Sequence, residues 1–291
     1  YADQGGHVTV DVAGAVGAAD FGNVTVASDS TVNSDVIDYH VATNATGMTS
    51  SGTITNASQT ADGDIHIDFD GNVAGLTTGG IGLANAGNPN QGDLDVDVGG
   101  ALNDRILIDG AVTVGDDGDA DSGVVDIDIH DAGAENIAVT GEIALNTADA
   151  DFDINVNLAA ASTGDVSLSG ITNAGDQQMD LVFAGDVNSL ALDGDIVLQD
   201  EGRLNSGILH VDIDGRVGDV GIAPNDSIAV GDDGEADTAH LTLHVAGQAG
   251  AATFGDINYA GQFGWGGVRE LAWFDSDISG DALESLNVGD V

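Results

Sequence analysis

The sequence predicts an all-β protein: a single-domain parallel β-helix, or β-solenoid, with about ten coils of roughly 29 residues and three short strands in each coil. Three observations lead to this prediction. A strand-like motif recurs along the 291 residues, apolar residues alternate with polar ones inside it, and glycines recur at fixed places between the motifs. A sequence period of 20–50 residues is typical of solenoids and other repeat architectures.

The first element of each repeat is a five-residue run in which apolar residues alternate with polar ones. Such alternation indicates a strand with one face buried and the other in water. Successive runs start 27 to 32 residues apart. The nine regular runs are residues 8–12, 37–41, 65–69, 94–98, 125–129, 152–156, 179–183, 209–213 and 241–245, and a degraded tenth is expected from Val268 to Phe274.

The rest of each repeat is predicted to form two more short strands, which are separated by glycine. In the fourth repeat the two apolar pairs are Ile106 with Ile108 and Val112 with Val114, and Gly110 lies between them. A polar stretch of variable length, called the variable loop below, then leads to the next repeat. Three short strands cannot bury an apolar face alone, so we expect successive coils to stack about 4.8 Å apart and to share one core.

The repeat continues through the chain without a linker, so residues 1–291 are predicted to form one domain. Residues 1–267 form nine regular coils in this interpretation, and 268–291 form a degraded, incomplete last coil with an assembly or capping role. The final strand should still be running at Val291. Either aromatic residues plug this end, or another segment completes it, which would be the next copy of the chain or a continuation of the same polypeptide. The expected partners are copies of the same chain that join head-to-tail through the solenoid ends.

The charge of the chain excludes several classes of partner. Fifty Asp and Glu face four Lys and Arg, for a formal net charge of −46. A nucleic acid or an anionic membrane surface requires basic side chains, so neither is an expected partner. No long apolar run predicts membrane insertion, and the absence of cysteine excludes disulfides and thiolate metal sites.

Acidic residues gather in two settings that suit divalent cations. The outward positions of the first strands form two columns of mainly Asp along the rod, and a similar acidic loop occurs in two repeats. Calcium takes six to eight oxygen ligands, so Ca²⁺ is the natural candidate; the alternative is a solvated acidic face without bound ions. The candidate ligands are Asp95, Asp97, Asp126 and Asp128 in the columns, and Asp116, Asp117, Asp119, Asp121, Asp232, Asp233, Glu235 and Asp237 in the loops.

The Asp-, Gly-, Asn- and Val-rich coils, without cysteine and with almost no basic residues, resemble secreted bacterial and archaeal acidic β-solenoid surface proteins of the adhesin, surface-layer or extracellular-filament type. The resemblance covers composition and architecture. The tandem nonapeptide of calcium-loaded RTX proteins does not occur, since residues 79–84 read Gly-Gly-Ile-Gly-Leu-Ala, with Ala where that pattern needs Asp.

This resemblance implies a non-enzymatic structural protein located outside the cell or on its surface. No cluster of Ser, His and Asp suited to catalysis interrupts the repeat, so no catalytic residue is predicted. The alternative is a parallel β-helix of the polysaccharide lyase or hydrolase type that binds or cleaves glycans, in which case cell-surface glycans would be partners.

Overall fold

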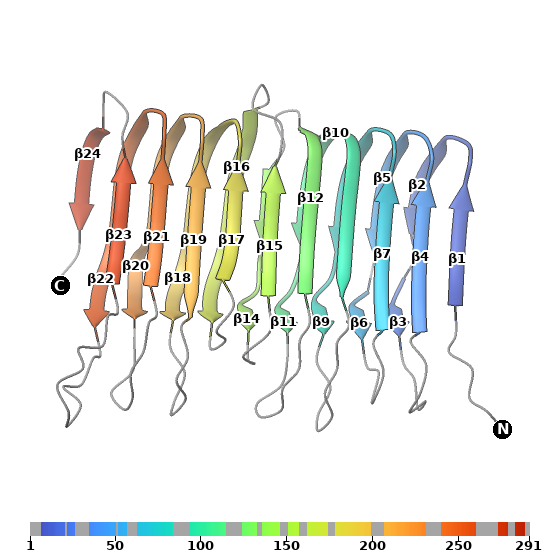
Figure 1. The fold of residues 1–291 in the computed structure, drawn as a ribbon, viewed down its shortest axis with the longest axis horizontal. Coiled ribbons are helices and arrows are strands. Elements are labelled where there is room, and N and C mark those ends of the chain that lie inside the picture. The colour runs from blue at the N-terminus through green and yellow to red at the C-terminus, as the bar shows by residue number, and fades with distance from the viewer. Residues whose placement is uncertain are drawn as a thin grey trace.

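The described residues of the computed structural model form one all-β parallel β-solenoid, drawn as an elongated rod in Figure 1, with the two termini at opposite ends. Every regular element among these residues is a strand, and every pairing between strands is parallel. The described ranges are 7–20, 22–26, 35–50, 52–56, 63–83, 93–114, 124–132, 136–145, 151–156, 162–173, 178–198, 207–230, 240–259, 273–278 and 283–288.

The strands stack in three ladders that run along the rod. The first ladder contains β1 (His7–Val12), β4 (Asp35–Val41), β7 (Gly63–Phe69), β10 (Leu94–Ile108), β12 (Val124–Ala132), β15 (Asp151–Val156), β17 (Gln178–Phe183), β19 (Ile208–Ile213), β21 (His240–Val245) and β23 (Trp273–Ile278).

The second ladder begins with β2 (Val16–Asp20), β5 (Ala45–Ser50) and β8 (Val73–Thr78), passes through the second half of β10, and continues with β13 (Asn136–Val139), β16 (Ser162–Asn173), β18 (Asp186–Leu198), β20 (Val217–Val230), β22 (Ala249–Tyr259) and β24 (Leu283–Val288). The third ladder contains β3 (Val24–Val26), β6 (Ile54–Asn56), β9 (Ile81–Leu83), β11 (Val112–Val114) and β14 (Ile143–Leu145), and then the final residues of β16, β18, β20 and β22.

The register confirms the predicted alternation in the first ladder. Each regular run found in the sequence lies within one strand, and its apolar residues stack on those of the neighbouring strands. The core is therefore a set of apolar columns shared by all three ladders. Its central column in the first ladder includes Ile67, Val96, Ile127, Ile154, Leu181 and Val211, each no more than 3% exposed.

The prediction of ten coils with three separate short strands each differs from the structure in detail. The first two strands of the fourth repeat merge into β10, and the last two strands merge in β16, β18, β20 and β22. At three of those corners the chain turns through a residue with positive φ: Gly170 (69°) in β16, Gly194 (86°) in β18 and Ala223 (45°) in β20. The parallel pairing continues on both sides of each bend, with register shifts at the bends.

The last strand of the first ladder begins later than the sequence predicts. The sequence places the degraded copy from Val268 to Phe274, whereas the strand is β23, in which Phe274 pairs with Leu241 and Ile278 with Val245. Phe274, Ser276 and Ile278 pair with the inward residues Leu241, Leu243 and Val245, and residues 260–272 lie between β22 and β23. Residues 283–288 form β24 in the second ladder, where Leu286 pairs with Ala252.

Glycines at the corners let the backbones of adjacent coils come close together. A Cβ placed on Gly215 would lie 2.3 Å from the backbone of Gly185, and one placed on Gly247 would lie 2.3 Å from the carbonyl oxygen of Gly215. Gly247 also donates its N–H to that oxygen at 3.0 Å. These corner positions therefore require glycine because there is no space for a side chain.

Short polar side chains at the corners add hydrogen bonds between coils. Asn44 Oδ1 accepts the N–H of Asn72 at 2.9 Å, and Asn72 Oδ1 accepts the N–H of Ala101 at 2.9 Å. Carboxylates do the same elsewhere along the rod, as when Asp186 Oδ1 accepts the N–H of Arg216 at 2.8 Å. Each such bond satisfies a backbone donor that a corner removes from the ladder.

Replacing Gly215 with alanine should destabilise the fold. The added methyl group would overlap the backbone of the preceding coil, and overpacking of this kind costs about 1–3 kcal/mol. Urea unfolding followed by circular dichroism would measure the loss. Gly82→Ala is the matched control, because a Cβ at Gly82 meets nothing within 4 Å; its free energy of unfolding should stay equal or rise by up to about 1 kcal/mol. Equal stability of the two variants would contradict the close-packed corner.

Candidate cation-binding face

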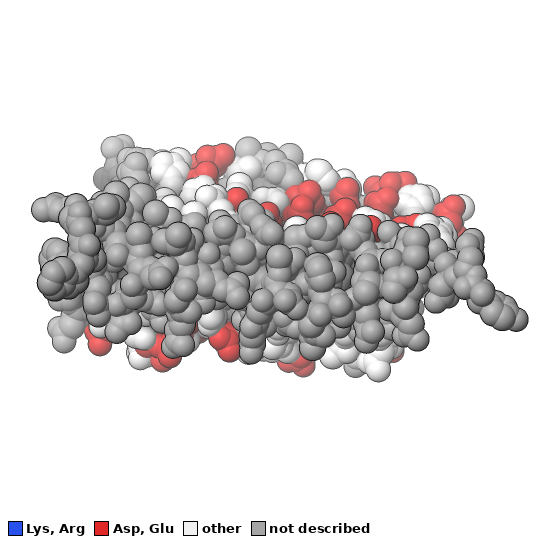
Figure 2. All heavy atoms as spheres, turned by 60° about the horizontal axis from the view of Figure 1, so that its bottom comes forward, with Lys and Arg blue, Asp and Glu red and all other residues white. Residues whose placement is uncertain are grey.

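The outward side chains of the first ladder form two continuous columns, here called the outer columns. One contains Thr9, Asp38, His66, Asp95, Asp126, Asp153, Asp180, His210 and Thr242, and the other contains Asp11, His40, Asp68, Asp97, Asp128, Asn155, Val182, Asp212 and His244. These are the columns that the sequence predicts. Figure 2 shows described acidic side chains gathered on two sides of the rod.

Four of the predicted ligands lie side by side in the outer columns. Asp95 pairs with Asp126 and Asp97 pairs with Asp128 across β10 and β12, and all four residues are half-buried. Partial burial raises the pKa of the Asp126 carboxyl, and the negative charges of Asp128 and Asp95 raise it further. Asn155 Nδ2 donates to Asp126 Oδ1 at 3.2 Å and partly offsets these effects.

These four carboxylates do not converge on one point. Within the described part of the chain, the one group of three acidic or histidine side chains whose ligand atoms all lie within 4.8 Å of one another is His40, Asp68 and Asp70. The acidic loop residues Asp116, Asp117, Asp119, Asp121, Asp232, Asp233, Glu235 and Asp237 lie outside the described residues. Their assignment as calcium ligands stays a prediction.

Histidine is the feature of this face that sequence reasoning missed. Each of several histidines lies against an aspartate of an adjacent coil, so the ring bridges two strands of the first ladder. The nitrogen–oxygen distances are 3.0 Å for His7–Asp38, 3.7 Å for His66–Asp95, 3.1 Å for His130–Asp97 and 2.9 Å for His210–Asp180. The signal was present in the sequence, because histidine takes the place of aspartate at several positions of the outer columns.

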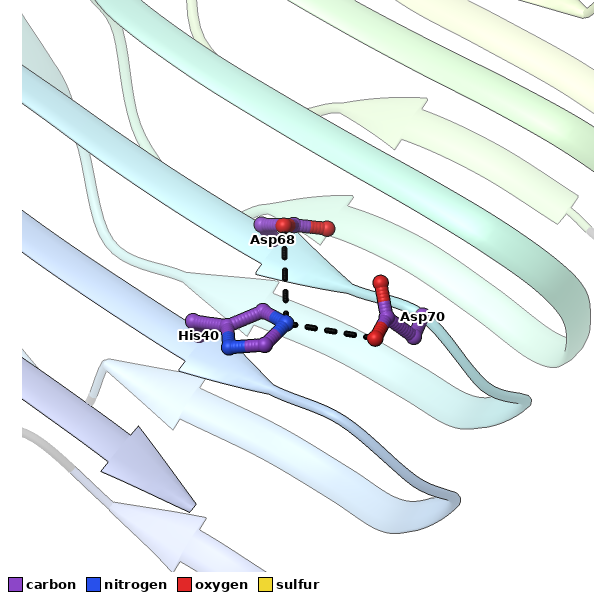
Figure 3. A group of neighbouring side chains, drawn as sticks. All are labelled: His40, Asp68 and Asp70. Carbon is purple, nitrogen blue, oxygen red and sulfur yellow. Dashed lines mark hydrogen bonds and ion pairs between the residues drawn. The ribbon is translucent and has the colours of Figure 1, made fainter. Parts of the chain in front are cut away.

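His40 has more acidic neighbours than these other histidines. Its Nε2 lies 3.3 Å from Asp70 Oδ2 and 3.8 Å from Asp68 Oδ2, and its Nδ1 lies 3.3 Å from Asp11 Oδ1. Figure 3 shows the Nε2 end of the imidazole facing both Asp68 and Asp70. The hydrogen bond to Asp70 is the largest cause that raises the pKa of His40, and partial desolvation opposes it.

The pairing of strands in the first ladder places Asp68 and Asp70 next to His40. His40 on β4 pairs directly with Asp68 on β7, so their side chains lie on the same outer face. Asp70 follows the end of β7 and is held there by its N–H, which donates to the carbonyl oxygen of Val41 at 3.1 Å. The imidazole of His40 thus has acidic neighbours from the coils on both sides of its own: Asp11 from one, and Asp68 and Asp70 from the other.

Comparison of the chain with protein-family models, with curated proteins and with solved structures found no match. Among the described residues, no helix is long and apolar enough to cross a membrane. Function is therefore inferred from the fold and from the charged face.

Replacing Asp126 with asparagine should stabilise the protein near neutral pH. A carboxyl whose pKa is higher in the folded state than in the unfolded state binds its proton more tightly when folded. Its ionised form therefore lowers stability above the folded-state pKa, and this loss disappears as the pH falls below the unfolded-state pKa. The amide oxygen of the variant still accepts from Asn155, so the packing is preserved.

The expected gain is below about 1 kcal/mol because the site is partly solvated. Thermal melting in EDTA across the acidic to neutral range would show the difference between Asp126→Asn and wild type shrinking as the pH falls. A difference that grows toward low pH would contradict the expected sign.

Proposed function

We propose that this protein is an extracellular structural protein, an acidic β-solenoid whose copies associate head-to-tail into a filament, surface layer or adhesive stalk, with Ca²⁺ stabilising the fold. The proposal includes the division of the rod into ten coils, one for each sequence repeat. The observation that carries the proposal is the exposed apolar end of the rod at β1.

The exposure of β1 contrasts with that of the inner coils. Val8 is 51% exposed and Val10 is 37% exposed, although both stand at the inward positions of the strand. The equivalent residues two coils along the rod, Ile65 and Ile67, are 0% and 1% exposed. Among the described residues, the inward apolar positions of β1 are therefore exposed, unlike those of the inner coils.

The backbone of β1 also supports association. Among the described strands, β1 pairs along one edge only, with β4. An open edge backed by exposed apolar side chains is a template for another strand. A head-to-tail contact that does not close into a ring generates a filament.

The charge of the outer columns supports a role for cations. Two carboxylates about 4.8 Å apart repel by about 0.9 kcal/mol in water, and partial burial increases this repulsion. Pairs such as Asp95 with Asp126 repeat along the first ladder, so the repulsion accumulates between the coils. A glycan-binding or glycan-cleaving β-helix stays the alternative hypothesis.

Calcium should raise the melting temperature of the protein relative to EDTA at matched ionic strength, because it binds the folded state through clustered carboxylates. Scanning calorimetry with CaCl₂, with EDTA, and with NaCl at the same ionic strength would measure the shift. Identical melting temperatures in all three conditions would leave the solvated acidic face as the interpretation of the outer columns.

Placing a charge on the exposed core at β1 should weaken self-association. Val8→Asp puts a carboxylate where a second rod would bury the strand, whereas Thr9→Asp puts the same charge on the outer face of the same strand. Sedimentation velocity over a range of concentrations, with electron microscopy of the largest species, compares the two variants with wild type. We expect Val8→Asp to shift the distribution to monomer and Thr9→Asp to resemble wild type.

Both variants should keep the wild-type circular dichroism spectrum, because Val8 is already half exposed. A wild-type protein that stays monomeric at every concentration, or equal loss of assembly in the two variants, would overturn association through β1.

A further inference from the structure

His40, Asp68 and Asp70 present three metal-ligating atoms to one point on the surface of the rod, as Figure 3 shows. A divalent ion bound at about 2.0–2.2 Å to three tetrahedral ligands needs donor atoms roughly 3.4 Å apart. The observed separations from His40 Nε2 are 3.3 Å to Asp70 and 3.8 Å to Asp68. Both separations from Nε2 are within a few tenths of an ångström of this spacing, and the three ligand atoms all lie within 4.8 Å of one another.

The second imidazole nitrogen is held by a carboxylate from a third coil. Asp11 Oδ1 lies 3.3 Å from His40 Nδ1, on the side of the ring away from Asp68 and Asp70. Metal-binding histidines usually donate their other ring N–H to a carboxylate or carbonyl, which fixes the ring and the tautomer. With Asp11 in this position, Nε2 is the nitrogen left to face the other two carboxylates.

The other histidines of this face provide an internal comparison. Within the described part of the chain, His7, His66, His130 and His210 each lie within 4 Å of one carboxylate oxygen, whereas His40 lies within 4 Å of three carboxylates. One imidazolium cannot neutralise three carboxylates, so this position keeps an excess of negative charge. This excess negative charge lies next to the nitrogen donor, Nε2 of His40.

The donor set indicates the class of ion. Calcium and magnesium favour oxygen ligands alone, whereas an imidazole nitrogen combined with carboxylates suits zinc and other first-row transition metals. Side-chain exposures of 36% for His40, 46% for Asp68 and 57% for Asp70 leave room for water to complete the coordination.

We propose that His40, Asp68 and Asp70 form a binding site for one divalent transition-metal ion, which ties β4 to β7, with Asp11 as the residue that positions the imidazole. This site shares no residue with the candidate calcium ligands Asp95, Asp97, Asp126 and Asp128, it includes a nitrogen donor, and it does not depend on self-association.

Zinc titration by calorimetry at mildly alkaline pH, on metal-free protein in NaCl, tests the proposal. His40→Gln removes the nitrogen donor, and His66→Gln is the matched control, because His66 lies in the neighbouring outer column with one acidic partner at 3.7 Å. We expect His40→Gln to lose one equivalent of bound zinc and His66→Gln to keep it. Asp11→Asn should weaken the same equivalent by about 10- to 100-fold without removing it.

Cobalt gives a readout that adventitious binding to surface carboxylates does not reproduce. Ligation by nitrogen and oxygen in a low-coordinate site should produce visible absorption bands in the wild type that disappear in His40→Gln and in Asp70→Asn. Circular dichroism of each variant checks the fold, and calcium stabilisation measured on His40→Gln separates this site from the calcium proposal. Equal zinc stoichiometry in wild type and His40→Gln, or equal losses in His40→Gln and His66→Gln, would overturn the assignment.

Discussion

Every coil of this protein is joined to the next by parallel backbone hydrogen bonds, and this in-register stacking constrains all its other features. Because the strands are parallel and nearly unshifted, each side chain lies on its counterpart one repeat away. Apolar residues then form columns inside, as with Ile127 and Ile154, and acids form columns outside, as with Asp97 and Asp128. The same geometry thus produces both the continuous core and the accumulated negative charge.

The short distance between adjacent coils also explains why the polar residues that bridge them are mostly asparagine and aspartate. Asparagine and aspartate side chains are just long enough to reach a backbone N–H of the next coil, as Asn72 and Asp186 do. A glutamate would have more rotamer freedom to lose for the same bond. Histidine has a complementary role, since its ring spans two coils and faces a carboxylate of the neighbouring strand, as in His210 with Asp180.

The fold was predictable because two periods are visible in the sequence. Apolar and polar residues alternate within each strand, and this alternation recurs once in each repeat. The alternation around Ile67 or Val211 identifies the buried face without reference to the rest of the chain. The merged strands and the start of β23 were not predictable, because the bends and the lengths between repeats leave no periodic signal. The group at His40 was missed for another reason: Asp70 lies beyond the alternating run, so no column of the sequence contains it.

The place where repeats differ most in length has a further consequence. Third-ladder strands end and first-ladder strands begin along the same edge of the rod, which lies at the bottom in Figure 1. Segments of different length there leave the pairing of the strands unchanged, whereas the corner between the first and second ladders has close contacts such as that of Gly215 with Gly185. A peptide inserted there in successive coils would be displayed as a linear array with a spacing of about 4.8 Å. One edge of the rod would thus carry inserted peptides at a regular spacing set by the stacking of the strands.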